Sequence, residues 1–227
     1  MSVNPDLFDL TMSDKARPLL DAVKKHIQQH VVPIMDEYER LGEEREHEWE
    51  FAPGQLELLE GAKQKAKASG LWNFFLPDAD TGEGLSNLDY AYIANELGKY
   101  PLASETLNCS APDTGNMEVL ERVGTTAQKT QWLEPLLRGE IRSAYAMTEP
   151  GHPSSDAKNI ATEAVLDGDE WLINGEKYFT SGAGDPRCAV YIVMGKTNPD
   201  AGRHEQQSMI IVPANTPGIT VVRALSV

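Results

Sequence analysis

The spacing of hydrophobic residues changes near Arg142 and divides the chain into two parts. Before this point, apolar side chains recur every three or four residues, as on one face of an amphipathic helix. After it, they recur about every second residue, as on one face of a strand. The sequence therefore predicts an α+β protein, with an all-α helical bundle over residues 1–142 and an antiparallel β domain over residues 143–227.

The helical part carries start and stop signals. Ser13 is a good N-cap for a first helix, whose apolar stripe reaches Ile34 and which Pro33 either bends or ends. Ser86 and Asp89 form a variant of the capping box at the start of another helix. The other predicted helices cover residues 55–69, 113–123 and 127–138, and the charge-rich segment 40–50 is expected to be a break.

Turn signals separate short apolar segments in the second part. Asp-Gly-Asp at 167–169 and Asn-Gly at 174–175 favour tight hairpin turns. The predicted strands cover residues 165–166, 171–173, 176–181, 189–196 and 208–212, and a further strand begins within 218–224.

Charge and composition narrow the classes of partner and compartment. A net charge of −15 argues against nucleic acid or an anionic membrane surface, although a few local donors would still suffice for an anionic nucleotide. No segment reaches the roughly 18 apolar residues of a membrane span, and the N-terminus MSVNPDLFDL lacks a signal core. Cys109 and Cys188 do not make a disulfide framework. We expect a cytoplasmic protein, or a mitochondrial matrix protein if a transit segment has been removed.

Several common chemistries find little support in the residues. His26 and His30 have the spacing of a zinc pair, but no further ligand cluster accompanies them. Gly182 and Gly184 begin a GxG that leads to no helix, unlike a dinucleotide fingerprint. His152 lies beside two serines without a nucleophile elbow or an orienting acid.

Small and hydroxyl-bearing residues gather in two segments, YAMTEPGHPSSD at 145–156 and GEKYFTSGAG at 175–184. Their hydroxyl donors are Thr148, Ser154, Ser155, Thr180 and Ser181. Glycine and proline keep bulk away, so a flat ligand could approach the main chain closely. Polar capping of strand ends is the alternative interpretation.

These same segments resemble the acyl-CoA dehydrogenase family. YAMTEP followed by Ser-Ser-Asp, and then NGEKYFTSGAG, carry the resemblance, which extends to ETLNCSAPDTGNMEVL at 105–120. Ser-Ser-Asp and SGAGDPRC resemble the long-chain-type branch, which includes multidomain vertebrate members and bacterial relatives. The resemblance implies an incomplete acyl-CoA dehydrogenase fold and a flavoprotein oxidoreductase with FAD as cofactor, acting on the CH–CH group of donors in fatty acid β-oxidation.

The resemblance also implies a ligand site. The first segment would lie along the flavin ring, with Thr148 aimed at its pyrimidine side, and the second segment would support the flavin, with Thr180 preferred to Ser181 as the contact. Ser155 matches the family serine near acyl-CoA and flavin, but this chain has one residue more than the commoner TEPxAGSD form, so Ser154 could take that place. The implied FAD contacts are Tyr145, Ala146, Met147, Thr148, Pro153, Ser154, Ser155, Tyr178, Phe179, Thr180 and Ser181, and the implied acyl-CoA contacts are Ser155 and Ser154.

The implied reaction is α,β-dehydrogenation of an acyl-CoA thioester, with electron-transferring flavoprotein as the acceptor. Residues 97–117 would line the acyl pocket, or make ordinary helix contacts. In the family, the catalytic glutamate lies in a C-terminal helical domain that also forms the oligomer core. The sequence ends before that domain, so we assign no catalytic residue here, and Glu149 is expected to hold its turn.

Three interpretations therefore stay open. The chain is a fragment, a half of a split enzyme that needs the missing C-terminal helical domain or a partner subunit, or a non-catalytic flavin and acyl-CoA binding module. A complete protein of this kind would be a homo-oligomer.

Overall fold

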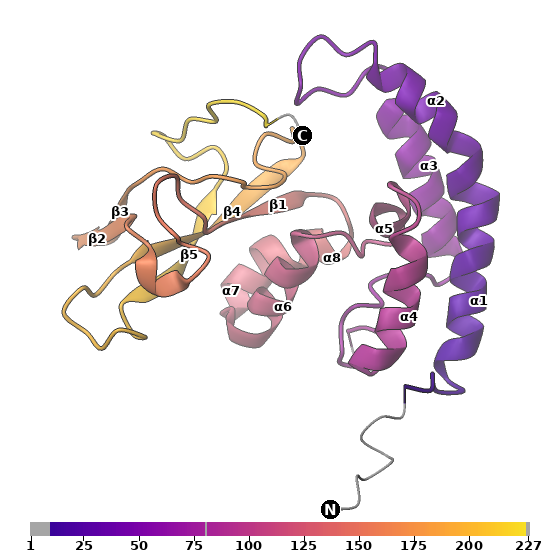
Figure 1. Ribbon diagram of the computed structural model, residues 1–227, viewed down its shortest axis with the longest axis horizontal. Helices are drawn as coiled ribbons and strands as arrows, with labels where there is room; N and C mark the ends of the chain where they lie inside the picture. The colour runs from indigo at the N-terminus through magenta and orange to yellow at the C-terminus, as the bar shows by residue number, and fades with distance from the viewer. Residues whose placement is uncertain (1–9, 80, 226–227) are drawn as a thin grey trace, which may run out of the picture. The chain divides into compact units, whose positions relative to one another are not determined.

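The computed structural model describes residues 10–79 and 81–225 (Figure 1). The contacts within the chain define two compact units, Met1–Thr114 and Gly115–Val227. The predicted fold class is confirmed, since a helical N-terminal region is followed by a β-sheet. The division at residues 142 and 143 stays a prediction.

The first unit is helical, and its core is built from the apolar faces that the sequence indicated. Leu59, Phe74, Ile93 and Leu107 are fully buried there. The helices of this unit are α1 (Ala16–His26), the π-helical segment η2 (Ile27–Val31), α2 (Val32–Gly42), α3 (Gln55–Ala68), α4 (Asn87–Leu97) and α5 (Ala103–Thr106).

Pro33 does not end the first helix, which continues through a π turn into α2. A proline has no N–H and its ring collides with the carbonyl four residues earlier, so a regular α-helix cannot pass through it undisturbed. The wider turn of η2 lies directly before this position, and the second π segment, η3 (Lys129–Leu133), stands in the same relation to Pro135. The prolines therefore account for both π turns.

The predicted N-cap at Ser86 is confirmed, and its contact with Asp89 joins two helices. Ser86 Oγ accepts a hydrogen bond from the Asp89 N–H at 3.1 Å. The Asp89 carboxylate accepts from Ser86 Oγ at 2.9 Å, and from the N–H and Oγ of Ser13 at 2.8 and 3.0 Å. The Ser13 N–H is the main cause that lowers the pKa of Asp89. One carboxylate thus links the start of α1 to the start of α4.

The second unit begins within α6 (Asp113–Val123) and continues through short helices into a sheet (Figure 1). The short helices are α7 (Thr126–Gln128), η3 (Lys129–Leu133), α8 (Glu134–Leu137) and the 3-10 turn η4 (Ala157–Asn159). The strands of the five-stranded sheet are β1 (Arg142–Ala146), β2 (Glu163–Asp167), β3 (Glu170–Asn174), β4 (Cys188–Lys196) and β5 (Gln207–Pro213).

The sheet is mixed, and the expectation of a purely antiparallel domain is wrong in this respect. β2 with β3 and β4 with β5 are antiparallel, whereas β1 and β2 both run parallel to β4. The turn signal at 167–169 predicts only the antiparallel pairing of β2 with β3, which are neighbours in the sequence. The parallel pairs are formed across long connections, which leave no turn signal in the sequence.

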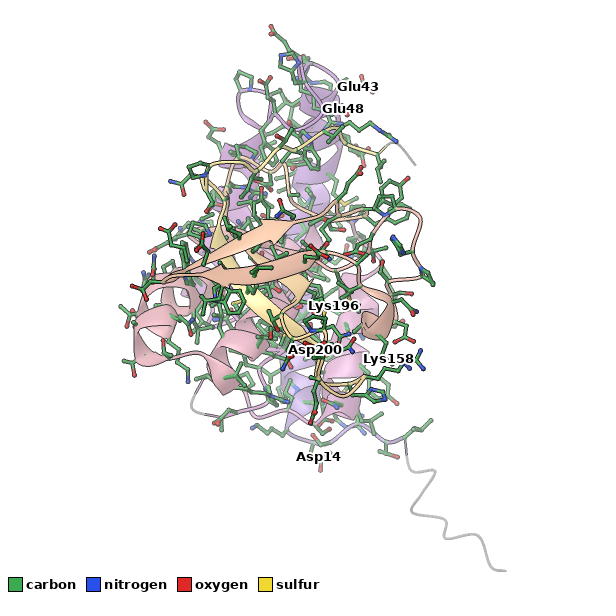
Figure 2. The ribbon with its side chains drawn as sticks, turned by 90° about the vertical axis from the view of Figure 1, so that its left-hand side faces the viewer. Asp14, Glu43, Glu48, Lys158, Lys196 and Asp200 are labelled. Atoms are coloured by element: carbon green, nitrogen blue, oxygen red, sulfur yellow. The ribbon has the colours of Figure 1, made fainter. Side chains whose placement is uncertain are left out.

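β1 and β2 follow one another along a single edge of β4. β5 occupies the other edge from Val190 to Lys196. On the edge of β4 opposite β5, β1 pairs with β4 as far as Val193. Further along the same edge, Glu163 of β2 pairs with Lys196. Lys196, labelled in Figure 2, is the last residue of β4, and β4 pairs there with β2 instead of β1. Residues 147–162, which we call the motif loop, leave the sheet between these two strands.

Two further strand predictions are wrong. Residues 176–181 are irregular, and the Asn-Gly at 174–175 does not make a hairpin. Phe179 has a φ of 54°, in the left-handed region that a strand excludes. Residues 218–224 form no strand either. The aromatic and hydroxyl residues Tyr178 to Ser181 have the composition of a strand, but the backbone of this segment is held by contacts with the motif loop.

Candidate functional site

The motif loop is closed at its base by the carboxylate of Glu149. Its Oε2 accepts the Ala161 N–H at 2.7 Å, and its Oε1 accepts the Thr162 N–H at 2.8 Å. These contacts join the point where the loop leaves β1 to the point where it enters β2. Lys158, labelled in Figure 2, lies on η4 within this loop and pairs with Asp156 at 3.2 Å.

Lys177 connects the second segment to the same carboxylate. Its Nζ donates to Glu149 Oε1 at 2.9 Å and to the Met147 carbonyl at 3.0 Å. The side chains of Lys177 and Glu149 are 12% and 3% exposed. Burial alone would raise the pKa of Glu149, but hydrogen bonds from Thr162, Lys177 and Ala161 outweigh it and lower the pKa to about 2. Glu149 is therefore ionised and fully engaged, as expected of a residue that holds its turn.

The two predicted segments come together through the backbone as well. The Tyr178 N–H donates to the Thr148 carbonyl at 2.7 Å. The following residues turn sharply, since the Ala183 N–H binds the Thr180 carbonyl at 3.2 Å, and the Tyr191 hydroxyl on β4 donates to the Ala183 carbonyl at 2.7 Å. The second segment is thus a loop fixed to the motif loop on one side and to β4 on the other.

Ser154 and Ser155 differ in their surroundings. Ser154 is fully buried, its Oγ accepts the Glu149 N–H, and it donates to the His152 carbonyl at 3.2 Å. Ser155 is exposed. Of these two serines, Ser155 is the one whose side chain lies on the surface, where a ligand could reach it.

Thr180 carries a polar atom that the fold leaves unmatched. Its hydroxyl oxygen is buried and has no hydrogen-bond partner among the residues that the structure describes. A buried hydroxyl without a partner loses free energy that a bound acceptor or donor would restore. Phe179 beside it is 67% exposed, and its ring lies against that of Tyr178 at 4.1 Å.

The remaining predicted contacts are spread around this loop junction. Ala146 is buried in the sheet, Tyr145, Met147 and Thr148 are half-buried, and Pro153 and Ser181 are exposed. Lys177 was not among the predicted site residues, because its two partners, Met147 and Glu149, lie about 30 residues away in the sequence.

Other functional classes receive no support from the described parts of the chain. In residues 10–79 and 81–225, no group of three or more His, Cys, Asp or Glu residues could hold a metal ion. None of the helices described there combines the length and hydropathy that crossing a bilayer requires.

Comparison with known proteins gives matches along nearly the whole chain. The model of the acyl-CoA dehydrogenase N-terminal domain matches residues 13–140, and that of the middle domain matches residues 144–227. FadE2 of Mycobacterium tuberculosis, assigned as an acyl-CoA dehydrogenase, is 48% identical over 97% of this chain and 53% of its own length. Acyl-CoA dehydrogenase family member 11 of Gallus gallus is 50% identical over 95% of this chain and 27% of its own length.

Solved structures agree with these matches. A protein of Mycobacterium abscessus assigned as an acyl-CoA dehydrogenase superposes with a TM-score of 0.86 at 46% identity, over 95% of this chain and 54% of its own. An acyl-CoA dehydrogenase of Bacillus anthracis complexed with FAD superposes with a TM-score of 0.68 at 22% identity, over 97% of this chain and 34% of its own, which shows the fold alone. The chain spans about half the length of the two mycobacterial relatives. Both the family resemblance and its vertebrate and bacterial branch are confirmed, and the chain belongs to the acyl-CoA dehydrogenase family, with its N-terminal and middle domains.

Proposed function

We propose that this chain supplies the flavin- and acyl-CoA-binding middle domain of an FAD-dependent acyl-CoA dehydrogenase. The observation that carries the proposal is the buried, unmatched hydroxyl of Thr180, at the junction of the two loops that resemble the family's flavin segments. When bound, FAD would take up the β hydrogen of an acyl-CoA thioester as hydride. The loops of this chain would bind the flavin and the thioester and hold them in place.

The residues divide into ligand contacts and supports. Thr180 and Thr148 would hydrogen-bond the polar edge of the flavin, and Phe179 would cover it with an exposed ring. Ser155 is the better candidate for the acyl-CoA contact, because the Ser154 hydroxyl already forms hydrogen bonds with Glu149 and His152 inside the loop. The proposal keeps the expected preference for Thr180, and the burial of Ser154 favours Ser155 as the acyl-CoA contact.

Proton abstraction from the α carbon needs a carboxylate outside this middle domain. Glu149 cannot serve, since its pKa of about 2 makes it a poor base and its oxygens already accept hydrogen bonds. We propose that the base, the acceptor contact with electron-transferring flavoprotein and the homo-oligomer interface come from the half of the relatives that this chain does not match, supplied in the same polypeptide or by a partner subunit. A non-catalytic flavin and acyl-CoA binding module is the alternative.

FAD binding by the purified chain tests the proposal. The purified chain is incubated with excess FAD and desalted, and retained flavin absorbance is recorded; quenching of flavin fluorescence gives the dissociation constant. Thr180→Val removes the hydroxyl at nearly constant shape and should weaken binding about fivefold to tenfold, which corresponds to roughly 1 kcal/mol for one hydrogen bond. Thr180→Ser should restore most of it.

The matched control is Thr197→Val, which removes a hydroxyl bonded to Ser208 on an exposed strand end of the same unit. It should leave FAD binding unchanged. Equal binding by wild type and Thr180→Val would refute the assignment of Thr180. Absence of flavin binding with the chain alone and with an added C-terminal helical half of FadE2 would refute the proposed function itself. Bleaching of bound flavin by acyl-CoA in the chain alone would show that a base lies within it.

A further inference from the structure

The ammonium group of Lys177 connects the motif loop to residues 177–181 through hydrogen bonds. Lys177 Nζ donates to the Met147 carbonyl at 3.0 Å and to Glu149 Oε1 at 2.9 Å. Both acceptors belong to the first turn of the motif loop, whereas Lys177 directly precedes Tyr178 to Ser181, the second segment. Any movement of one segment against the other must stretch these contacts.

Removing only one member of the Glu149–Lys177 ion pair should destabilise the protein. Burial lowers the pKa of Lys177, which means that its charged form is kept in place by Glu149 against a desolvation penalty. Removing one partner of a buried ion pair leaves the other as an uncompensated charge. The loss of either side chain therefore removes the ion pair and leaves the other charge buried without its partner.

The backbone around the pair transmits this constraint to the ligand-facing residues. The Tyr178 N–H reaches the Thr148 carbonyl, and the Glu149 N–H reaches the buried Ser154 Oγ directly before Ser155. Thr148 and Ser155 on one loop, and Thr180 on the other, are thus set by contacts that begin at the Glu149–Lys177 pair. None of these contacts uses the hydroxyl of Thr180.

We infer that Glu149 and Lys177 are positioning residues, which couple the motif loop to residues 177–181 so that both halves of the flavin site form together. We assign neither of them a ligand contact, because the hydrogen bonds of both side chains are made to the loops themselves. This inference rests on the proposed function for its consequence in flavin binding, but the coupling itself is a property of the chain without ligand.

Hydrogen exchange in the ligand-free chain tests the coupling. Lys177→Met keeps the apolar stem and removes the ammonium. It should speed exchange of the amides of Tyr178, Ala161 and Thr162 together, by at least tenfold, while amides between β4 and β5 keep their protection. Glu149→Gln should loosen the same amides, and the double variant should be no worse than the worse single variant.

Two further variants keep the test decisive. Lys177→Gln can still donate to the Met147 carbonyl and should give intermediate exchange, which serves if Lys177→Met fails to fold. Arg138→Met removes an exposed cation that pairs with Glu140 in the same unit and should change nothing. Loosening of only one of the two loops, or additive effects in the double variant, would overturn the coupling.

FAD titration then measures the consequence for the site. Variants that loosen both loops should bind FAD at least tenfold more weakly than wild type, and Lys177→Gln should recover part of that loss. Unweakened binding by loosened variants would overturn the positioning role. If wild type binds no FAD under any condition, the proposed function fails, whereas the exchange data still decide whether the pair couples the loops.

Discussion

Acid should remove a defined share of stability through Glu149. The pKa of its carboxyl is about 2 in the folded chain, below the ordinary value of 4.5. Because the folded-state pKa is depressed, the contribution is fully present above pH 4.5 and is lost as the pH falls towards 2. A pKa difference of about 2.5, at about 1.4 kcal/mol for each pKa unit, gives at most about 3.5 kcal/mol. Glu149→Gln should therefore cost up to about 3.5 kcal/mol at pH 7 and little near pH 2.

Urea unfolding of wild type and Glu149→Gln, between pH 7 and pH 2.5, measures this difference. The free energy of unfolding of the variant must be subtracted from that of wild type at each pH, because other groups titrate too. Burial and the neighbouring His30 lower the pKa of His26 to about 4, so protonation of His26 destabilises the fold as the pH falls from 6.5 towards 4. This second effect is common to both proteins and cancels.

The pH dependence of the difference between the two proteins distinguishes a charge effect from a change of shape. The gap between the two unfolding free energies should close steadily between about pH 4.5 and pH 2, in step with protonation of one carboxyl. A gap that stays constant across this range would show that the substitution acts through shape alone. Glu140→Gln, at an exposed carboxylate paired with Arg138, should show a much smaller pH-dependent gap, because solvent screens an exposed ion pair.

Three further changes test the packing around the same elements, and each is measured by thermal unfolding. Ser86→Ala should cost about 1 kcal/mol, because it removes the cap of α4 and a donor to Asp89. Gly61→Ala should stabilise the helical unit by about 0.5–1 kcal/mol, since a methyl group there meets nothing within 4 Å in the middle of α3; destabilisation would contradict this. Gly175→Ala should cost about 1–3 kcal/mol, because its Cβ would lie 2.2 Å from Thr162 Oγ1.

Local signals in the sequence predicted the helices well. Helices over 55–69, 113–123 and 127–138 are close to the observed elements, because each has a one-sided apolar pattern and a stop signal. The continuation of the first helix past Pro33 could not be read from the sequence. A proline within an apolar stripe marks a disturbance, and whether a π turn absorbs it depends on packing in three dimensions.

The β part was less predictable, for a physical reason. Hairpin turns are encoded locally, as Gly168 shows between β2 and β3. Parallel pairing of β1 and β2 with β4 depends on the whole connection between the strands and has no local signature. The composition of residues 176–181 fits a strand, but a contact with the distant Thr148 fixes its backbone instead.

The candidate site was also predictable only where its features are local in the sequence. Residue types and a family resemblance indicated which residues belong together, and the structure brings the two segments into contact as expected. They did not indicate Lys177, because its role depends on Met147 and Glu149 and appears only when the loops are placed side by side.

The succession of β1 and β2 along one edge of β4 gives the motif loop freedom to change in length during evolution. Its two ends are fixed by the sheet and by Glu149, so a residue inserted between them need not shift the register of any strand. The entropic cost of lengthening a closed loop grows only slowly with its length. A longer or shorter loop at this point is therefore compatible with the same pairing of β1, β2 and β4.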